Sequence, residues 1–223
     1  MIRLDNISYG YTKKNNILNE ISFTIKDGDC LAVLGHNGSG KTTLAYLIIG
    51  LLKQQTGNIY NQFSKIAYLP EHGGTYKNLS VINNLKFKAK LEGIAQDSYI
   101  IENYLQDFGL ESSKHKLVLH LSQGLEKRLA LAMFFLTNCQ LLYLDEPTNT
   151  LDPEMIIKLK QRVNSLRESG KTLIINSHNL TFVQEVCTDI LILQNGNICF
   201  YQKNKEVEIE ELYMDLVGDK NEK

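Results

Sequence analysis

The chain has 223 residues, which is enough for one domain with a large core and short for two. Its 24 basic and 25 acidic side chains nearly cancel, so it lacks the basic surface that nucleic-acid-binding proteins use. The longest apolar stretch, residues 129–136, is too short to cross a bilayer, and the first residues do not form a signal peptide. Four widely spaced cysteines without a C-x-x-C pair favour free thiols. We therefore expect a single cytoplasmic domain that does not bind nucleic acid.

Short strands and one helix are predicted in the first seventy residues. Residues 21–25 alternate apolar and polar side chains, which predicts an antiparallel strand after a β-rich start. A turn leads into residues 30–34, a continuous apolar run that predicts a buried strand. Residues 43–49 predict a helix, and residues 66–69 predict another short strand, which Pro70 ends.

Between the buried strand and the helix, residues 35–42 read Gly-His-Asn-Gly-Ser-Gly-Lys-Thr and match G-x-x-x-x-G-K-[ST]. The strand before and the helix after make this match specific for a phosphate-binding loop, against the alternative of a glycine-rich turn without a ligand. Backbone N–H groups and the helix N-terminus favour phosphate there, Lys41 is placed for the β- and γ-phosphates, and Thr42 for Mg²⁺. The residues expected to hold a nucleoside triphosphate are Gly35, Asn37, Gly38, Ser39, Gly40, Lys41, Thr42 and Thr43.

Beyond the loop, the apolar spacing becomes helical from about residue 81 to residue 110. After residue 140, strands and helices alternate again, so the chain predicts an α/β core with a helical insertion in its middle. The later elements expected are a strand over residues 141–144, a helix from Pro153 to near Gly170, a strand over 172–176, a hairpin around Asn195 and Gly196, and a docked surface helix over 207–217.

Polar side chains follow two of these strands and suggest chemistry. Asp145 ends one strand where phosphate-loop NTPases hold Mg²⁺, and Glu146 extends past it toward the γ-phosphate, where a carboxylate can polarise the attacking water. Acidic pairs also cap helices, but Pro147 follows directly and the next helix opens only after Asp152. His178 follows the next strand, so its imidazole is expected at the same sheet edge as both carboxylates.

Together, the order and spacing of these motifs resemble the nucleotide-binding subunits of ATP-binding cassette (ABC) transporters, from about residue 2 to residue 217. The shared order is an early aromatic residue, the phosphate loop, a strand ending in a polar residue, Leu-Ser-x-Gly, Asp-Glu, a Leu-Asp turn and His. The resemblance implies one ABC-type ATPase domain over residues 1–223. Its fold would be an α/β P-loop NTPase (RecA-like) core with an N-terminal antiparallel β subdomain and an α-helical subdomain inserted at about residues 73–138.

By position, Tyr11 resembles the aromatic residue that stacks on adenine in this family, although Tyr9 is an alternative and strand packing would explain either. Residues 121–125, Leu-Ser-Gln-Gly-Leu, match the family signature Leu-Ser-Gly-Gly-Gln. Ser122 is an expected helix N-cap, and the resemblance implies that Ser122 and Gly124 bind the γ-phosphate held by the loop of another subunit.

Two departures from the family pattern stand out. Gln123 and Leu125 replace a Gly and the Gln of the signature, but the two residues expected to touch phosphate remain, so we expect activity to survive. Glu71 stands where most members carry glutamine near Mg²⁺ and the attacking water, which adds negative charge and removes an amide donor. Residues 68–79 resemble the branch that serves export-type permeases, including exporters and self-immunity systems for antibiotic peptides.

The resemblance implies that the chain hydrolyses ATP with Mg²⁺ and drives transport, in the export direction, through a separate integral membrane permease. Two copies would close head to tail around two ATP molecules, on the inner face of the cell membrane. A permease helix is expected to dock around residues 71–91, with Tyr76 and Leu79 as candidate contacts or as residues packed inside the insertion. The implied catalytic residues are Lys41, Glu71, Glu146 and His178, and the implied metal ligands are Thr42, Glu71 and Asp145.

Two other functions compete with transport. A soluble ABC-family ATPase acting on ribosomes or DNA would use the same chemistry, but ribosome-acting relatives usually carry two such domains and DNA-repair relatives insert a long coiled coil. The chain has room for only one domain, and no heptads lie between the phosphate loop and the signature. A kinase with a phosphate loop would leave the Leu-Ser-x-Gly helix unexplained.

Overall fold

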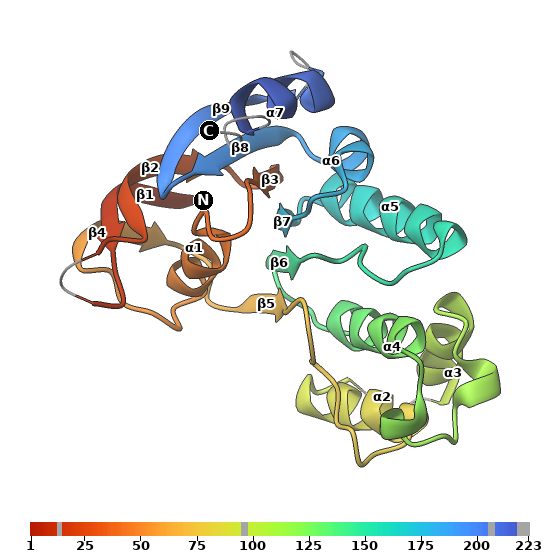
Figure 1. Cartoon of the computed structure of the whole chain (residues 1–223). Coiled ribbons are helices and arrows are strands. Elements are labelled where there is room, and N and C mark those ends of the chain that lie inside the picture. The colour runs from red at the N-terminus through yellow and green to blue at the C-terminus, as the bar shows by residue number, and fades with distance from the viewer. Residues whose placement is uncertain (13–14, 95–97, 205–207, 218–223) are drawn as a thin grey trace.

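The computed structural model describes residues 1–12, 15–94, 98–204 and 208–217 (Figure 1). A six-stranded sheet with the strand order β5-β6-β7-β3-β8-β9 lies at the centre, and a three-stranded sheet with the order β2-β1-β4 lies beside it. The strands are β1 (Ile2–Tyr9), β2 (Leu18–Ile25), β3 (Cys30–Leu34), β4 (Thr56–Asn61), β5 (Ile66–Leu69), β6 (Leu141–Asp145), β7 (Thr172–Asn176), β8 (Asp189–Gln194) and β9 (Asn197–Lys203). The helices are α1 (Lys41–Ile48), α2 (Val81–Leu91), α3 (Ser98–Asp107), α4 (Gln123–Phe135), α5 (Pro153–Glu168), α6 (Leu180–Val186) and α7 (Ile209–Val217), with 3-10 turns at Glu111–Ser113 and Val118–His120.

The central sheet is parallel from β5 to β8 and ends with the antiparallel strand β9. Strands β3, β6 and β7 are buried along their whole length, as continuous apolar runs predict for a sheet covered on both faces. In β3, Leu31 and Val33 pack with α1 and the smaller sheet, whereas Ala32 and Leu34 pack with α4, α5 and α6. Because successive side chains of a strand point to opposite faces of the sheet, the sheet separates the core into two parts. The side chains at the ends of the strands lie outside both parts and can form a site.

The predicted antiparallel start is confirmed, because β1 pairs antiparallel with β2 over most of its length. Its other neighbour, β4, was not predicted from the sequence. The β4 segment Thr-Gly-Asn-Ile-Tyr-Asn is exposed except at Ile59, so it has no apolar alternation that would reveal a strand.

The region predicted to be helical from residue 81 to residue 110 contains two helices. Helix α2 ends at Leu91, where Gly93 adopts a left-handed conformation with φ of 67°, and α3 begins at Ser98. Both helices contribute buried side chains to the core region that contains α4, and Figure 1 shows the three helices grouped beyond β5.

The C-terminal elements follow the predicted pattern. Asn195 and Gly196 both have positive φ, 49° and 76°, in the turn between β8 and β9, as the Asn-Gly pair predicts. Helix α7 packs Leu212, Tyr213 and Leu216 against the core, and the predicted first residue of this helix, Val207, lies outside the described residues. All four cysteines are free thiols, as expected. Across the described ranges, no helix combines the length and apolar character needed to span a membrane.

Candidate nucleotide site

The loop between β3 and α1 has the conformation that its glycines predict. Gly35, Gly38 and Gly40 have φ of 146°, 82° and 109°. A Cβ atom at Gly35 would lie 2.3 Å from the carbonyl oxygen of Leu193, and one at Gly40 would lie 2.6 Å from Cδ2 of Leu18. Glycine is therefore needed at Gly35 and Gly40 both for the backbone conformation and for the close approach of neighbouring segments.

Lys41, the first residue of α1, lies across this loop. Its Nζ atom donates to the main-chain oxygen of Gly35 at 2.6 Å and to that of His36 at 3.1 Å. Burial lowers the pKa of Lys41, while the negative charges of Glu146 and Asp145 act in the opposite direction. The ammonium group thus lies between the loop and the carboxylates at the strand ends.

The loop forms one wall of a pocket of ≈ 860 Å³. Because β3, β7 and β6 are parallel neighbours, their carboxyl ends meet at this edge of the sheet. The predicted site residues that line the pocket are Tyr11, Gly35, Asn37, Gly38, Gly40, Lys41, Thr42, Thr43, Glu71, Asp145, Glu146 and His178. The structure therefore brings most of the predicted site together.

Asp145 is held by a chain of hydrogen bonds. The hydroxyl of Tyr68 donates to Oδ2 of Asp145 at 3.1 Å, and Nδ2 of Asn176 donates to Oδ1 at 3.0 Å. The buried hydroxyl of Tyr143 in turn donates to Oδ1 of Asn176 at 2.9 Å. Burial and the charge of Asp145 raise the pKa of both tyrosines, so their hydroxyls stay protonated as donors. This network fixes the orientation of the carboxylate.

Glu146 and His178 face each other at the ends of β6 and β7. Nδ1 of His178 lies 2.9 Å from Oε2 of Glu146, and the main-chain N–H of His178 donates to the same oxygen at 3.3 Å. Glu146 has a left-handed φ of 46°, and its N–H donates to the oxygen of Asn176 at 2.9 Å. The Glu146 side chain is 11% exposed and the imidazole 70% exposed, so a nearly buried carboxylate is oriented by a histidine that reaches solvent.

Glu71 follows β5 and Pro70 and lines the same pocket. Its Oε1 atom accepts a hydrogen bond from Nδ2 of Asn149 at 3.2 Å. Its main-chain oxygen accepts one from Nζ of Lys127 at 3.1 Å. The loop that carries Glu71 is therefore tied to α4 and to the turn after β6.

Of the two tyrosines considered for adenine, Tyr11 is the one that lines the pocket. It is 60% exposed, and its hydroxyl lies 3.3 Å from Oγ1 of Thr43. Tyr9 is partly buried against the core beside the small sheet, and its ring packs edge-on against that of Tyr11 with 5.3 Å between centroids. Packing therefore explains Tyr9, and Tyr11 offers an open ring face.

Three predicted site residues do not line the pocket. Ser39 is fully buried beneath the loop, so its side chain does not face the pocket. Ser122 is the N-cap of α4, as predicted, and its Oγ accepts from the N–H of Leu125 at 3.4 Å. Gly124 lies against the turn at Thr150. A Cβ atom added to Gly124 would lie 3.0 Å from the main-chain oxygen of Thr150. Ser122 and Gly124 are thus separate from the pocket of their own chain.

The residues present fit a nucleotide with Mg²⁺. Thr42 offers a hydroxyl and Asp145 a carboxylate, and Mg²⁺ usually takes one or two carboxylates together with phosphate oxygens. Within the part of the chain that the structure describes, no group of three or more His, Cys, Asp or Glu could hold a metal alone. The Oγ atom of Ser39 is buried under the loop without a hydrogen-bond partner.

Four residues at the site were not singled out from the sequence: Ile17, His36 and Tyr213, which line the pocket, and Lys127, which lies beside it. Tyr213 of α7 lines the pocket, and burial together with the charge of Glu146 raises its pKa. Lys127 of α4 is buried and hydrogen-bonded to the Glu71 segment. The amphipathic pattern of α7 signalled that it docks but not where, and the sequence around Lys127 gave no sign that the lysine is buried.

Comparison with known proteins agrees with this geometry. The family model described as ABC transporter matches residues 18–149. An uncharacterized ABC transporter ATP-binding protein of Methanocaldococcus jannaschii is 31% identical over 208 residues, covering 92% of this chain and 79% of that protein. A lantibiotic transport ATP-binding protein of Streptococcus pyogenes is 31% identical over 222 residues, covering 96% of each. A solved ATP-binding subunit of an ABC transporter matches with a TM-score of 0.86 at 25% identity, covering 97% of this chain and 99% of that one. The predicted P-loop NTPase fold is confirmed, and the chain belongs to the ABC transporter family as one of its ATP-binding ATPases.

Proposed function

We propose that this chain hydrolyses ATP to drive export through a separate integral membrane permease on the inner face of the cell membrane. The observation that carries the proposal is the pairing of Glu146 with His178 beside Lys41 and Asp145 in one pocket. Phosphoryl transfer needs such positioned charges more than it needs covalent chemistry.

Each group has a distinct role in this proposal. The N–H groups of the glycine loop and the ammonium of Lys41 bind the β- and γ-phosphates, and Tyr11 stacks on the adenine. Thr42 and Asp145 hold Mg²⁺, with Glu71 nearby, and the metal, when bound, neutralises charge that develops on the phosphate oxygens. Glu146 accepts a proton from the attacking water, and His178 keeps its carboxylate in place.

We infer that the site is completed by a second copy of the chain. Ser122 is exposed at the N-terminus of α4, and Gly124 follows in its first turn, yet neither lines the pocket of its own chain. In a head-to-tail homodimer, the helix N-terminus and the Ser122 hydroxyl would meet the γ-phosphate held by the other copy. Loss of the γ-phosphate on hydrolysis then removes contacts that favour the closed dimer.

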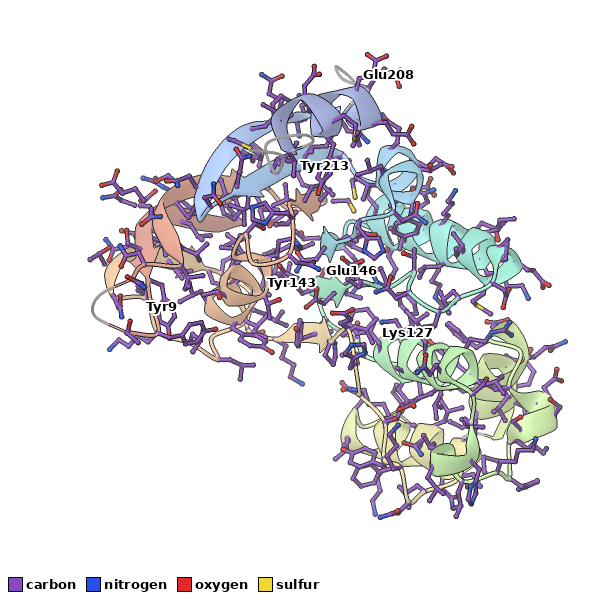
Figure 2. All side chains as sticks on the ribbon, viewed as in Figure 1. Tyr9, Lys127, Tyr143, Glu146, Glu208 and Tyr213 are labelled. Carbon is purple, nitrogen blue, oxygen red and sulfur yellow. The ribbon has the colours of Figure 1, made fainter. Side chains whose placement is uncertain are left out.

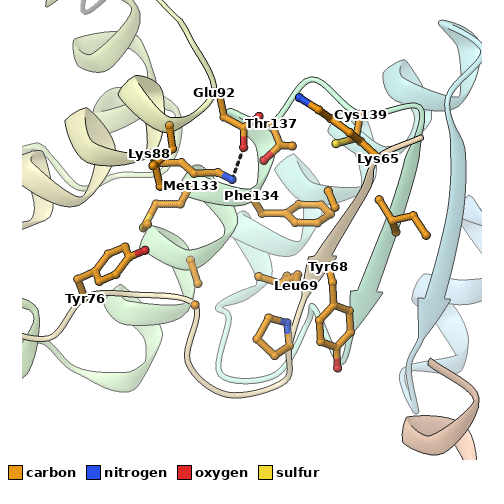
Figure 3. Close-up of a pocket in the computed structure, with 16 residues that line it drawn as sticks. Lys65, Tyr68, Leu69, Tyr76, Lys88, Glu92, Met133, Phe134, Thr137 and Cys139 are labelled. Carbon is orange, nitrogen blue, oxygen red and sulfur yellow. Dashed lines mark hydrogen bonds and ion pairs between the residues drawn. The ribbon is translucent and has the colours of Figure 1, made fainter. Parts of the chain in front are cut away.

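We propose that the permease docks in a hollow of ≈ 460 Å³ between β5, α2 and α4 (Figure 3). Apolar groups line it, including Tyr76, Leu91 and Met133, of which Leu91 is 61% exposed. Lys88 and Glu92 form an ion pair of 2.5 Å at this hollow. A helix with an apolar face fits such a groove, and the groove leads through Pro70 to the Glu71 segment. Leu79 is partly buried and does not line the hollow, so of the two candidates only Tyr76 is retained.

The export direction rests on Glu71 and its surroundings, and the similarity to a lantibiotic transport protein supports it. We propose that Glu71 serves coupling to the permease more than nucleotide binding. The E71Q variant should then change the ratio of transport to hydrolysis while the ATP Kd changes by less than about threefold. If transport, basal hydrolysis and ATP affinity all stay the same in E71Q, Glu71 is a neutral variant of glutamine.

The transport role is tested by purifying the tagged chain with ATP, in mild detergent, from membranes of the cells that produce it. A multi-spanning membrane protein in stoichiometric yield is the expected result. Recovery with ribosomes, DNA or soluble proteins alone would leave the ATPase chemistry intact and would instead support a soluble ABC-family ATPase.

A further inference from the structure

Lys127 is unusual because it is a charged side chain buried in the first turns of α4. Only 7% of it is exposed, and lysine is rarely buried to this extent unless it is paired. Burial lowers the pKa of Lys127, and the charges of Glu71, Asp145 and Glu146, in that order, act against this shift. Figure 2 shows Lys127 near Glu146, where α4 faces the end of β6.

The contacts of Lys127 lead to the loop after β5. Its Nζ atom donates to the main-chain oxygen of Glu71 at 3.1 Å, while Nδ2 of Asn149 donates to Oε1 of the same residue at 3.2 Å. Lys127, Glu71 and Asn149 line a hollow of ≈ 390 Å³, and Glu71 also lines the nucleotide pocket. Glu71 therefore separates the nucleotide pocket from the hollow of ≈ 390 Å³, and Lys127 contacts Glu71 from the side of α4.

Three carboxylates and two lysines meet around this boundary. Asp145 and Glu146 are 6% and 8% exposed, whereas the Glu71 side chain is 44% exposed and its Oε1 atom lies 3.8 Å from Nε2 of His72. Lys41 lies on the side of the phosphate loop and Lys127 on the side of α4, and the charges of all three carboxylates favour the charged form of both lysines. Substituting Lys127 therefore removes a hydrogen bond to the main chain and an attraction to the carboxylates.

We propose that Lys127 is a positioning residue of the ATPase. Its ammonium fastens the Glu71 segment to α4 through the main-chain oxygen of Glu71 and adds a longer-range attraction to the Glu71 carboxylate, so that α4 and this segment move as one body. The inference rests on the proposed function of the pocket, and it adds a residue that links the Ser122 end of α4 to the wall of the nucleotide pocket.

The test is a double-mutant cycle of K127M and E71Q in the full chain without nucleotide, followed by steady-state kinetics. K127M should lower the Tm by about 4–8 °C, because losing the hydrogen bond from this charged donor costs about 2 kcal/mol, and each kcal/mol shifts the Tm of a domain of this size by about 2–4 °C. It should also lower kcat by about tenfold while KM for ATP changes by less than about threefold. In the K127M/E71Q double variant, part of the lost Tm should return, because E71Q removes the carboxylate charge that Lys127 attracts while the main-chain acceptor of Glu71 stays without its donor.

K77M is the matched control. Lys77 borders the same hollow, but its side chain is 56% exposed and pairs with Glu126. The K77M change should shift Tm by less than about 2 °C and should add to E71Q without rescue.

The proposal is overturned if K127M leaves Tm unchanged or raises it, or if its effect simply adds to that of E71Q. In either case the lysine would be a buried side chain that Met replaces without cost. If K127M does not fold, K127Q replaces it in the cycle, because glutamine keeps a hydrogen-bond donor and lacks the charge. If K127M and K127Q both fail to fold, each is combined with E71Q. Folding of these double variants supports the proposal, and their failure to fold overturns it. ATP hydrolysis by the unmodified chain tests the proposed function separately. If the chain does not hydrolyse ATP, the Tm values of the double-mutant cycle are unaffected, because they are measured without nucleotide.

Discussion

The 2.9 Å contact between Nδ1 of His178 and Oε2 of Glu146 joins the ends of two neighbouring parallel strands. The two residues are 32 positions apart in the sequence, and a second contact, from the main-chain N–H of His178, reaches the same carboxylate oxygen. The position of Glu146 is therefore determined by the sheet itself, through a left-handed turn at the end of β6. An oriented carboxylate next to the γ-phosphate position is what activation of water requires.

The E146Q variant should retain ATP and lose nearly all turnover. Glutamine has the same shape but cannot accept the proton of the attacking water, so kcat should fall by about 10²–10⁴-fold. The ATP Kd, measured by equilibrium fluorescence, should change by less than about threefold. E154Q is the matched control, because Glu154 lies on the exposed start of α5 with its side chain 79% exposed. Full hydrolysis by E146Q would remove Glu146 from the catalytic role.

The H178A variant should lower kcat by about 10–100-fold while KM for ATP stays nearly constant, because the imidazole acts on the orientation of Glu146 and not on ground-state binding. Steady-state kinetics over a range of ATP concentrations separates the two parameters. His115, an exposed histidine in the segment after α3, provides the control variant H115A. A raised KM with unchanged kcat in H178A would instead mean that His178 binds the substrate.

The K41A variant should abolish tight ATP binding. Losing a charged donor at the β- and γ-phosphates costs about 3 kcal/mol, which corresponds to about a 100-fold rise in Kd. The fold should persist, because the hydrogen bonds of the Lys41 ammonium go to main-chain oxygens of its own loop, at the edge of the pocket. Titration calorimetry with ATP, with K53A at an exposed position as the control, measures the effect. An affinity equal to that of the unmodified chain would refute the assigned role.

The N176A variant should destabilise the chain and weaken the metal site together. It leaves the buried hydroxyl of Tyr143 without its acceptor and removes a donor to Asp145, at a cost of about 2 kcal/mol. The Tm should fall by about 4–8 °C, and the Mg²⁺ concentration for half-maximal hydrolysis should rise. An unchanged Tm, equal to that of the exposed-site control N58A, would mean that the network does not support Asp145.

The parts of the fold that the sequence predicts well are those with a strong local signal. Strands β3, β5 and β7 have the bounds that the sequence predicts, because a short apolar run marks each of these strands of the parallel sheet. The starts of α4 and α5 are equally clear, since Ser122 and Asp152 cap them through hydrogen bonds to Leu125 and Met155. The same reasoning placed Asp145, Glu146 and His178 at one sheet edge, which the structure confirms.

The features that the sequence does not predict depend on contacts between distant segments. Strand β4 exists because β1 offers it an edge, not because its own residues favour a strand. Tyr213 reaches the pocket because α7 docks there, and the buried Lys127 donates to the Glu71 segment, which is 56 residues away in the sequence. Such burial is a property of tertiary packing, and charge or periodicity along the chain does not reveal it.

We propose that this chain hydrolyses ATP as a dimer in which each pocket takes Ser122 and Gly124 from the other copy. Light scattering of E146Q in solution, with and without Mg²⁺ and ATP, measures this assembly, and K41A serves as the variant that cannot hold the nucleotide. We expect E146Q with ATP to have twice the chain mass of 25.4 kDa, while E146Q without ATP and K41A with ATP keep the mass of one chain. A single-chain mass for ATP-saturated E146Q, together with ATP hydrolysis by the unmodified chain, would contradict the shared site.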